Sequence, residues 1–74
     1  MRMSARNRLP GIVRHVRLGG VMAQVDIAAG DNEVTAVITR DAAEELELKE
    51  GDRVFAVIKS TDVMVEKSEP GDGQ

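Results

Sequence analysis

The most informative part of the chain is residues 35–60, TAVITRDAAEELELKEGDRVFAVIKS. Two runs alternate in polarity, one that begins just before this stretch and one near its end. Such alternation is typical of strands with one buried side. The residues expected on the buried side are Val34, Ala36 and Ile38 in the first run and Val54, Ala56 and Ile58 in the second. Between the runs we expect a short helix capped by Asp41, with Leu46 and Leu48 closing over the core. Gly51 lies in the next turn, where a positive φ is expected.

The flanking sequence predicts three more strands. Residues 11–18 and 21–28 form a predicted hairpin around Gly19-Gly20, since adjacent glycines can take the positive φ values that match strand twist. Residues 30–32, Gly-Asp-Asn, form the next turn. Alternation at 62–67 predicts a fifth strand. Five short strands with one helix between the third and the fourth predict an all-β fold, an OB-fold-like five-stranded barrel.

Length and composition predict one small domain that assembles with copies of itself. We expect residues 1–10 to form an arm, 11–67 the folded domain and 68–74 a disordered tail. The 74-residue chain has no cysteine, so no disulfide or thiolate-bound metal stabilises it, and Phe55 is its only aromatic residue. Because 42% of the residues are nevertheless hydrophobic, we expect strands to be buried between subunits.

Charge is unevenly distributed along the chain, although its net value is only -3. The first 20 residues contain no acid, and their arginines are Arg2, Arg6, Arg8, Arg14 and Arg17. Such a positive edge can attract an anion. No apolar run is long enough to cross a bilayer and no signal-peptide core is present, so we expect a cytoplasmic protein without a membrane partner.

The reactive side chains do not predict an enzyme. His15 is the only histidine and has no cysteine beside it, so it cannot assemble a catalytic triad by itself. No phosphate-binding glycine loop is present. Glu44, Glu45 and Glu47 are interpreted as a solvated helix face, because their spacing does not converge as metal ligation requires.

A small polar set remains that suits a tetrahedral oxyanion. The arm contains Ser4, Arg6 and Asn7, and the fourth predicted strand ends with Lys59 and Ser60. Cationic groups and hydroxyl donors without a nearby carboxylate are the chemistry that an oxyanion requires. We expect the arm of one subunit to lie against the end of the fourth strand of a neighbour. The alternative is that both cations are ordinary surface residues and the serines are turn residues.

Several motifs in order resemble the molbindins, the single-domain molybdate-binding proteins also called Mop, and the similar TOBE domains. The matching segments are SARN at 4–7, PG at 10–11, VMAQV at 21–25, TAVIT at 35–39, LELKEG at 46–51 and AVIKS at 56–60. The resemblance covers residues 3–65. It implies an OB-like barrel of five strands, assembled as a hexamer (a trimer of dimers) with oxyanions held between subunits.

The same resemblance implies which residues bind the anion. Its side-chain ligands would be Ser4, Arg6, Lys59 and Ser60, with Thr39 and the main-chain donors of Gly20, Val21 and Met22 as secondary candidates. The family often has Asn where Met22 stands, and a thioether cannot donate a hydrogen bond. The implied function is storage and homeostasis of molybdate or tungstate, without a catalytic cofactor.

Two other functions compete with oxyanion binding. An OB module that binds nucleic acid would fit the fold and the arginines, but one aromatic residue cannot supply the usual stacking platform. An AbrB-like DNA-binding regulator would fit residues 42–54, a segment that resembles part of that fold and leaves the SARN arm unexplained.

Overall fold

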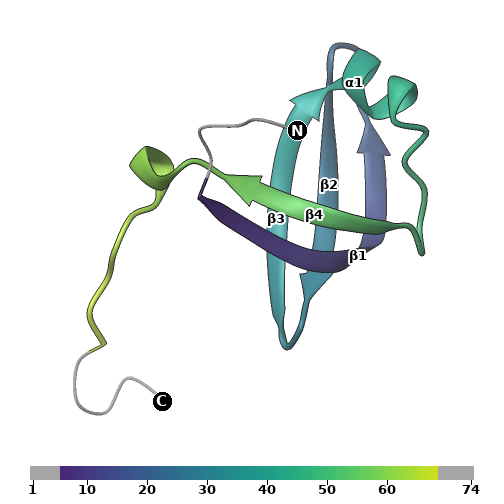
Figure 1. Ribbon diagram of the computed structural model, residues 1–74. Helices are drawn as coiled ribbons and strands as arrows, with labels where there is room; N and C mark the ends of the chain where they lie inside the picture. The colour runs from purple at the N-terminus through teal and green to yellow at the C-terminus, as the bar shows by residue number, and fades with distance from the viewer. Residues whose placement is uncertain (1–5, 69–74) are drawn as a thin grey trace.

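The chain folds into one curved antiparallel sheet with a short helix at one end, as a computed structural model of residues 6–68 shows (Figure 1). The strands pair in the order β3-β2-β1-β4. The elements are β1 (Asn7–Leu18), β2 (Met22–Ala29), β3 (Asn32–Thr39), α1 (Arg40–Glu45), β4 (Arg53–Ile58) and the 3-10 helix η1 (Ser60–Asp62). The expectation of a mostly β chain with one helix between the third and fourth strands is therefore confirmed, and no helix within these residues is long and apolar enough to cross a bilayer.

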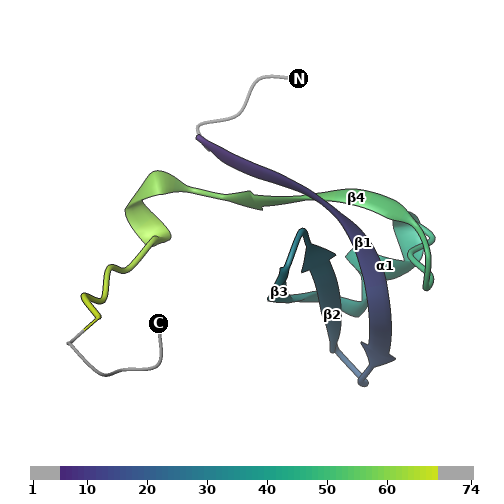
Figure 2. The same cartoon turned by 90° about the horizontal axis from the view of Figure 1, so that it is seen from below.

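Strand β1 is long because it serves two partners. Its residues from Ile12 onward pair with β2, while residues from Asn7 to Ile12 pair with β4. The strand begins within the segment expected to be an arm, and it curves from one partner to the other (Figure 2). Gly11 lies at the crossing, where a Cβ would be 2.6 Å from Ala28 O and 2.6 Å from Ile27 Cγ2. Glycine is required there because the two strands pass too closely for any side chain.

The core lies on one side of the sheet. Its fully buried members are Val13, Val25, Ile27 and Ala56, and the partly buried residues that pack on them are Val16, Val34, Ala36, Ile38, Leu48 and Val54. The alternation predicted for β3 and β4 is confirmed, since the outward residues of both strands are exposed. Leu46 differs from the prediction: it ends α1 with 66% of its surface exposed, and only Leu48 reaches the core.

The turns confirm some glycine assignments and correct others. Gly51 has φ 93° and Gly30 has φ 64°, as turn positions require. Gly19 and Gly20 do not have positive φ, so the expected primed turn is wrong. Gly19 is needed instead for space, because a Cβ there would lie 2.9 Å from Met22 O.

Thr39, and not Asp41, caps helix α1. The Thr39 hydroxyl accepts a hydrogen bond from Ala42 N–H at 3.1 Å, and α1 begins at Arg40. Asp41 lies within the first turn, where its charge still suits the helix dipole. The cap therefore falls two residues earlier than the sequence predicts.

The fifth predicted strand is absent from the described residues. Its first residue, Asp62, ends η1, and residues 63–68 are irregular. Figure 1 shows this segment leading away from the sheet after η1. Val63, Met64 and Val65 are 48%, 93% and 92% exposed. Alternation can predict that a strand is possible, but a strand also needs a partner to supply its hydrogen bonds, and this segment pairs with neither edge strand, β3 or β4. The described chain is thus an open four-stranded sheet.

Replacing Gly11 by Ala is expected to destabilise the protein by about 1–3 kcal/mol, because the new Cβ would press on backbone that cannot move independently. The free energy of unfolding by urea measures this. Gly20→Ala is the matched control, since a Cβ there meets nothing within 4 Å, and it should change stability far less. Equal losses for both variants would contradict the close crossing of β1 and β2.

Candidate anion-binding site

Arg6 and Lys59 flank the last residue pair of the β1–β4 ladder at one end of the sheet. The last pair of the β1–β4 ladder is Asn7 with Ile58, so Arg6 precedes and Lys59 follows the same pair. Residues opposite each other in antiparallel strands point to the same face. Both side chains belong to this chain, whereas the sequence predicted that the arm would reach the fourth strand of a neighbour.

The surroundings of these two cations suit an anion. Both residues are exposed, and neither forms an ion pair within residues 6–68, where the ion pairs found involve His15 with Asp26 and Arg40 with Glu44. Ser60 starts η1 directly after Lys59 and is also exposed. Ser4 lies outside the described residues. Two neighbouring positive charges and a hydroxyl donor thus lie at one edge of the sheet.

The secondary candidates lie at the other end of β1, where the β1–β2 turn approaches the start of α1 (Figure 1). Met22 pairs with Thr39 in the ladder between β2 and β3. Main-chain bonds hold the turn: Gly19 N–H donates to Met22 C=O at 2.8 Å, and Arg40 N–H donates to Val21 C=O at 2.7 Å. The Thr39 hydroxyl caps α1 through its oxygen, and its own hydrogen remains able to donate.

A single chain does not bring the two groups of candidates together. β1 runs the whole way between them, from Asn7 beside Lys59 to Leu18 beside the turn. A 12-residue strand spans at most about 36 Å, and the curvature of β1 shortens this distance only in part. Within one copy of the chain, the length of β1 thus separates the two groups.

Arg40 is a residue of this region that the sequence reasoning did not identify. Its Nη1 donates to Gly19 C=O at 3.1 Å, and its Nε lies 3.3 Å from Glu44 Oε2. The position of a basic residue directly after the TAVIT strand was visible in the sequence. Its partner was not, because Gly19 is 21 residues earlier and only the sheet brings the two together.

A buried acid occupies the outward face of the sheet. Asp26 is 7% exposed, and its Oδ1 accepts hydrogen bonds from Gln24 Nε2 at 3.0 Å and Thr35 Oγ1 at 3.3 Å. His15 Nδ1 is 3.9 Å from Asp26 Oδ2, and its side chain is 57% exposed. No group of three or more potential metal ligands is found in residues 6–68. We interpret the cluster as a satisfied polar network within the sheet.

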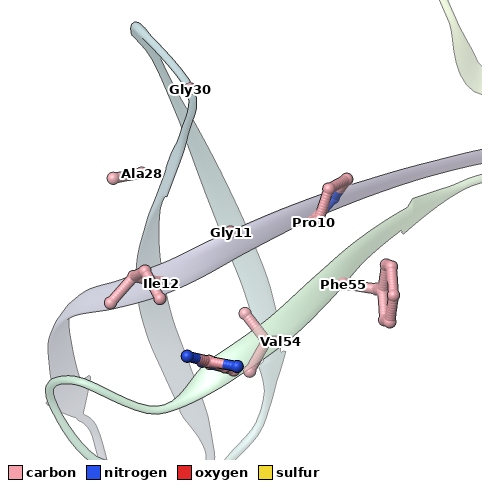
Figure 3. A pocket seen from close by; sticks show the side chains of 8 residues that line it. Pro10, Gly11, Ile12, Ala28, Gly30, Val54 and Phe55 are labelled. Carbon is pink, nitrogen blue, oxygen red and sulfur yellow. The ribbon is translucent and has the colours of Figure 1, made fainter.

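An apolar groove lies beside the crossing of β1 and β4 (Figure 3). It has a volume of about 520 Å³ and is lined by Pro10, Gly11, Ile12, Ala28, Gly30, Arg53, Val54 and Phe55. None of the predicted oxyanion ligands lines it. The ring of Phe55 is also covered on one side by the Arg8 guanidinium, 4.4 Å from the ring centroid. The groove offers a single cation and few polar groups, which does not suit a small dianion.

This sheet, with its neighbouring cations, is the fold of a small ligand-binding module, and residues 3–65 match the TOBE domain model. The chain belongs to the TOBE domain family. Within it, the chain belongs with the molbindin (Mop) proteins, as the sequence resemblance indicated: it is 52% identical over 67 residues to molybdenum-pterin-binding protein 3 of Clostridium pasteurianum, covering 88% of this chain and 97% of that protein. It is also 50% identical over 66 residues to the molybdenum transport protein ModE of Azotobacter vinelandii. That match covers 88% of this chain but only 24% of ModE.

Solved structures agree with this assignment. A molybdate-binding protein from Sporomusa ovata superposes with a TM-score of 0.87 at 37% identity, covering 90% of this chain and all of that one. ModG, described as a cytoplasmic molybdate-binding protein and solved with molybdate bound, gives a TM-score of 0.76 at 43% identity, covering 81% of this chain and 43% of that one. These relatives are named as binding or transport proteins, and they do not favour the nucleic-acid or AbrB-like alternatives.

Lys59→Gln is expected to stabilise the anion-free protein at low ionic strength by about 0.2–1 kcal/mol, because it removes a like-charged neighbour of Arg6 across the ladder. The gain should shrink in 1 M salt, where the screening length falls to about 3 Å. Urea unfolding at both salt concentrations measures it. Lys67→Gln removes the same charge outside the sheet and serves as the control; equal effects of the two variants would contradict the placement of Lys59.

Proposed function

We propose that this protein binds molybdate or tungstate reversibly in the cytoplasm and serves as a store that buffers the free oxyanion. The observation that carries the proposal is the pair of neighbouring, exposed cations Arg6 and Lys59, without an ion-pair partner in residues 6–68. Two positive charges match the two negative charges of the anion. The names of the related binding proteins supply the choice of molybdenum as the element.

Each proposed ligand has a distinct task. The guanidinium of Arg6 can donate two parallel hydrogen bonds to adjacent oxygens, while the ammonium of Lys59 acts as a compact charge. Ser60, and Ser4 by resemblance, would donate hydroxyl hydrogens. Binding involves no covalent step, so release needs only dissociation. Molybdate and tungstate have longer metal–oxygen bonds than sulfate has sulfur–oxygen bonds, so a rigid ring of donors can distinguish them by size.

We further propose that the anions lie between subunits of a homo-oligomer, with the hexamer as the expected form. The length of β1 supports this, because within one copy it separates Arg6 and Lys59 from the Gly20–Met22 turn and Thr39. Exposed apolar side chains support assembly as well: Leu9, Phe55 and Val57 on the β1–β4 ribbon are 41%, 53% and 38% exposed. The irregular segment with Val63–Val65 adds more apolar surface for a neighbour to cover, and a fifth strand of the barrel would arise there.

Arg6→Ala is expected to weaken molybdate binding by about tenfold to a hundredfold, since a hydrogen bond to a charged group contributes about 1.5–3 kcal/mol. Calorimetric titration with molybdate, and with sulfate for comparison, measures the affinity. Arg14→Ala is the charge-matched control and should bind nearly as well as the unaltered protein. If the folded protein takes up neither anion, the proposed function is wrong; if Arg6→Ala binds normally, Arg6 is not a ligand.

Molybdate is also expected to stabilise the assembled state. An anion that binds only the oligomer stabilises it by about 2.7 kcal/mol at a concentration one hundred times the dissociation constant. The subunit dissociation curve, followed by light scattering on dilution, should therefore shift to lower protein concentration with molybdate and not with chloride. A curve that does not move, at anion concentrations that saturate the protein, would show that the sites are not shared between subunits.

A further inference from the structure

The β1–β2 turn has an incomplete set of main-chain hydrogen bonds, and Arg40 donates to the carbonyl that the missing bond would use. In a two-residue hairpin loop, the residues that flank the loop normally exchange two bonds. Here Gly19 N–H donates to Met22 C=O at 2.8 Å, but Gly19 C=O accepts from Arg40 Nη1 at 3.1 Å. The return bond from Met22 N–H to Gly19 C=O is not among the turn hydrogen bonds of residues 6–68.

A second hydrogen bond from Arg40 holds the carbonyl on the other side of the turn. The main-chain N–H of Arg40 donates to Val21 C=O at 2.7 Å, so Arg40 holds two carbonyls of the turn. All peptide bonds described here are trans, and in a trans peptide the N–H points opposite to the C=O of the same unit. The N–H groups of Gly20 and Met22 consequently point away from the Arg40 groups that hold these carbonyls.

We infer that Arg40 is a positioning residue for the oxyanion site: by holding the carbonyls of Gly19 and Val21, it leaves the N–H groups of Gly20 and Met22 free to donate to a tetrahedral oxyanion. This inference rests on the proposed function and adds a residue to it. The donors are main-chain groups, so the thioether of Met22 is no obstacle to binding there. The anion would contact the turn and not Arg40 itself.

The chemistry of the side chain explains why an arginine stands at this position. Its planar guanidinium donates to Gly19 C=O through Nη1 while Nε faces Glu44 Oε2 at 3.3 Å. Glu44 offsets much of the Arg40 charge, so Arg40 acts mainly by orientation. A lysine presents a single nitrogen on a flexible stem and cannot hold both partners in a fixed plane. Gly19 completes the arrangement, since a Cβ there would collide with Met22 O at 2.9 Å.

Arg40→Met tests the inference through two readouts on the full chain. Without Arg40, Gly19 C=O is no longer held toward the guanidinium and can turn to accept from Met22 N–H. Hydrogen exchange of the Met22 amide, measured by NMR without anion, should therefore become slower than in the unaltered protein. Molybdate affinity, measured by calorimetry, should fall about tenfold, in proportion to one weakened charge-assisted hydrogen bond. Arg40→Lys should recover part of both properties. A merely structural role would instead make turn amides exchange faster.

Controls separate this inference from the function on which it rests. Arg14→Met removes the same charge from β1 and should leave both readouts unchanged. Glu44→Gln keeps the bond to Gly19 and should leave Met22 exchange unchanged. If the unaltered protein does not bind molybdate, the proposed function fails, while the exchange data still report on Arg40. If the unaltered protein binds and Arg40→Met binds equally well, or its Met22 amide exchanges no more slowly, the inference is overturned.

Discussion

The structure depends on Val13, the point where β1 changes partners. Its side chain is 1% exposed at the centre of the core, and both of its main-chain groups bond to the turn before β4: Val13 N–H to Asp52 C=O and Gly51 N–H to Val13 C=O, each at 2.9 Å. The register with β2 shifts just after it, between Val13 and His15. One residue therefore fixes the core, the bend of β1 and the start of β4.

The placement of the two cations follows from this constraint. Because the turn at Gly51 and Asp52 is held against Val13, β4 must begin at Arg53 opposite Ile12, and each later residue of β4 meets an earlier residue of β1. That register continues to Ile58 opposite Asn7 and leaves Lys59 beside Arg6. A shift of one residue would turn the two side chains to opposite faces. The bend thus determines the charge pattern at the far end of the sheet.

The same long strand separates the two groups of candidate ligands, and this separation is the physical reason for expecting shared sites. A core as small as this one leaves much apolar surface exposed, including Leu9, Phe55 and Val57 on the ribbon of β1 and β4 and Val63–Val65 after η1. In the proposed oligomer, a second copy would cover part of that surface, and a turn held by Arg40 would supply donors to the cations of a neighbour. Assembly and anion binding would then stabilise each other.

The sequence by itself determined the strands, the short helix and the buried side of each strand, because alternation of apolar and polar residues reports directly which side is buried. It also indicated the family and the cations Arg6 and Lys59. It misplaced the helix cap, since both Thr39 and Asp41 can cap a helix and Asp is often the better cap. It also misjudged the glycine turn, because Gly19 is needed for lack of space and does not have positive φ. It predicted a strand at 62–67, where the described chain is irregular and pairs with neither edge strand of the sheet. Only the tertiary structure decided which strand β1 pairs with at each end. It also placed Arg6 and Lys59 on either side of one residue pair and set the guanidinium of Arg40 against Gly19 C=O. These arrangements join residues far apart in the chain and depend on strand register, which the sequence does not give.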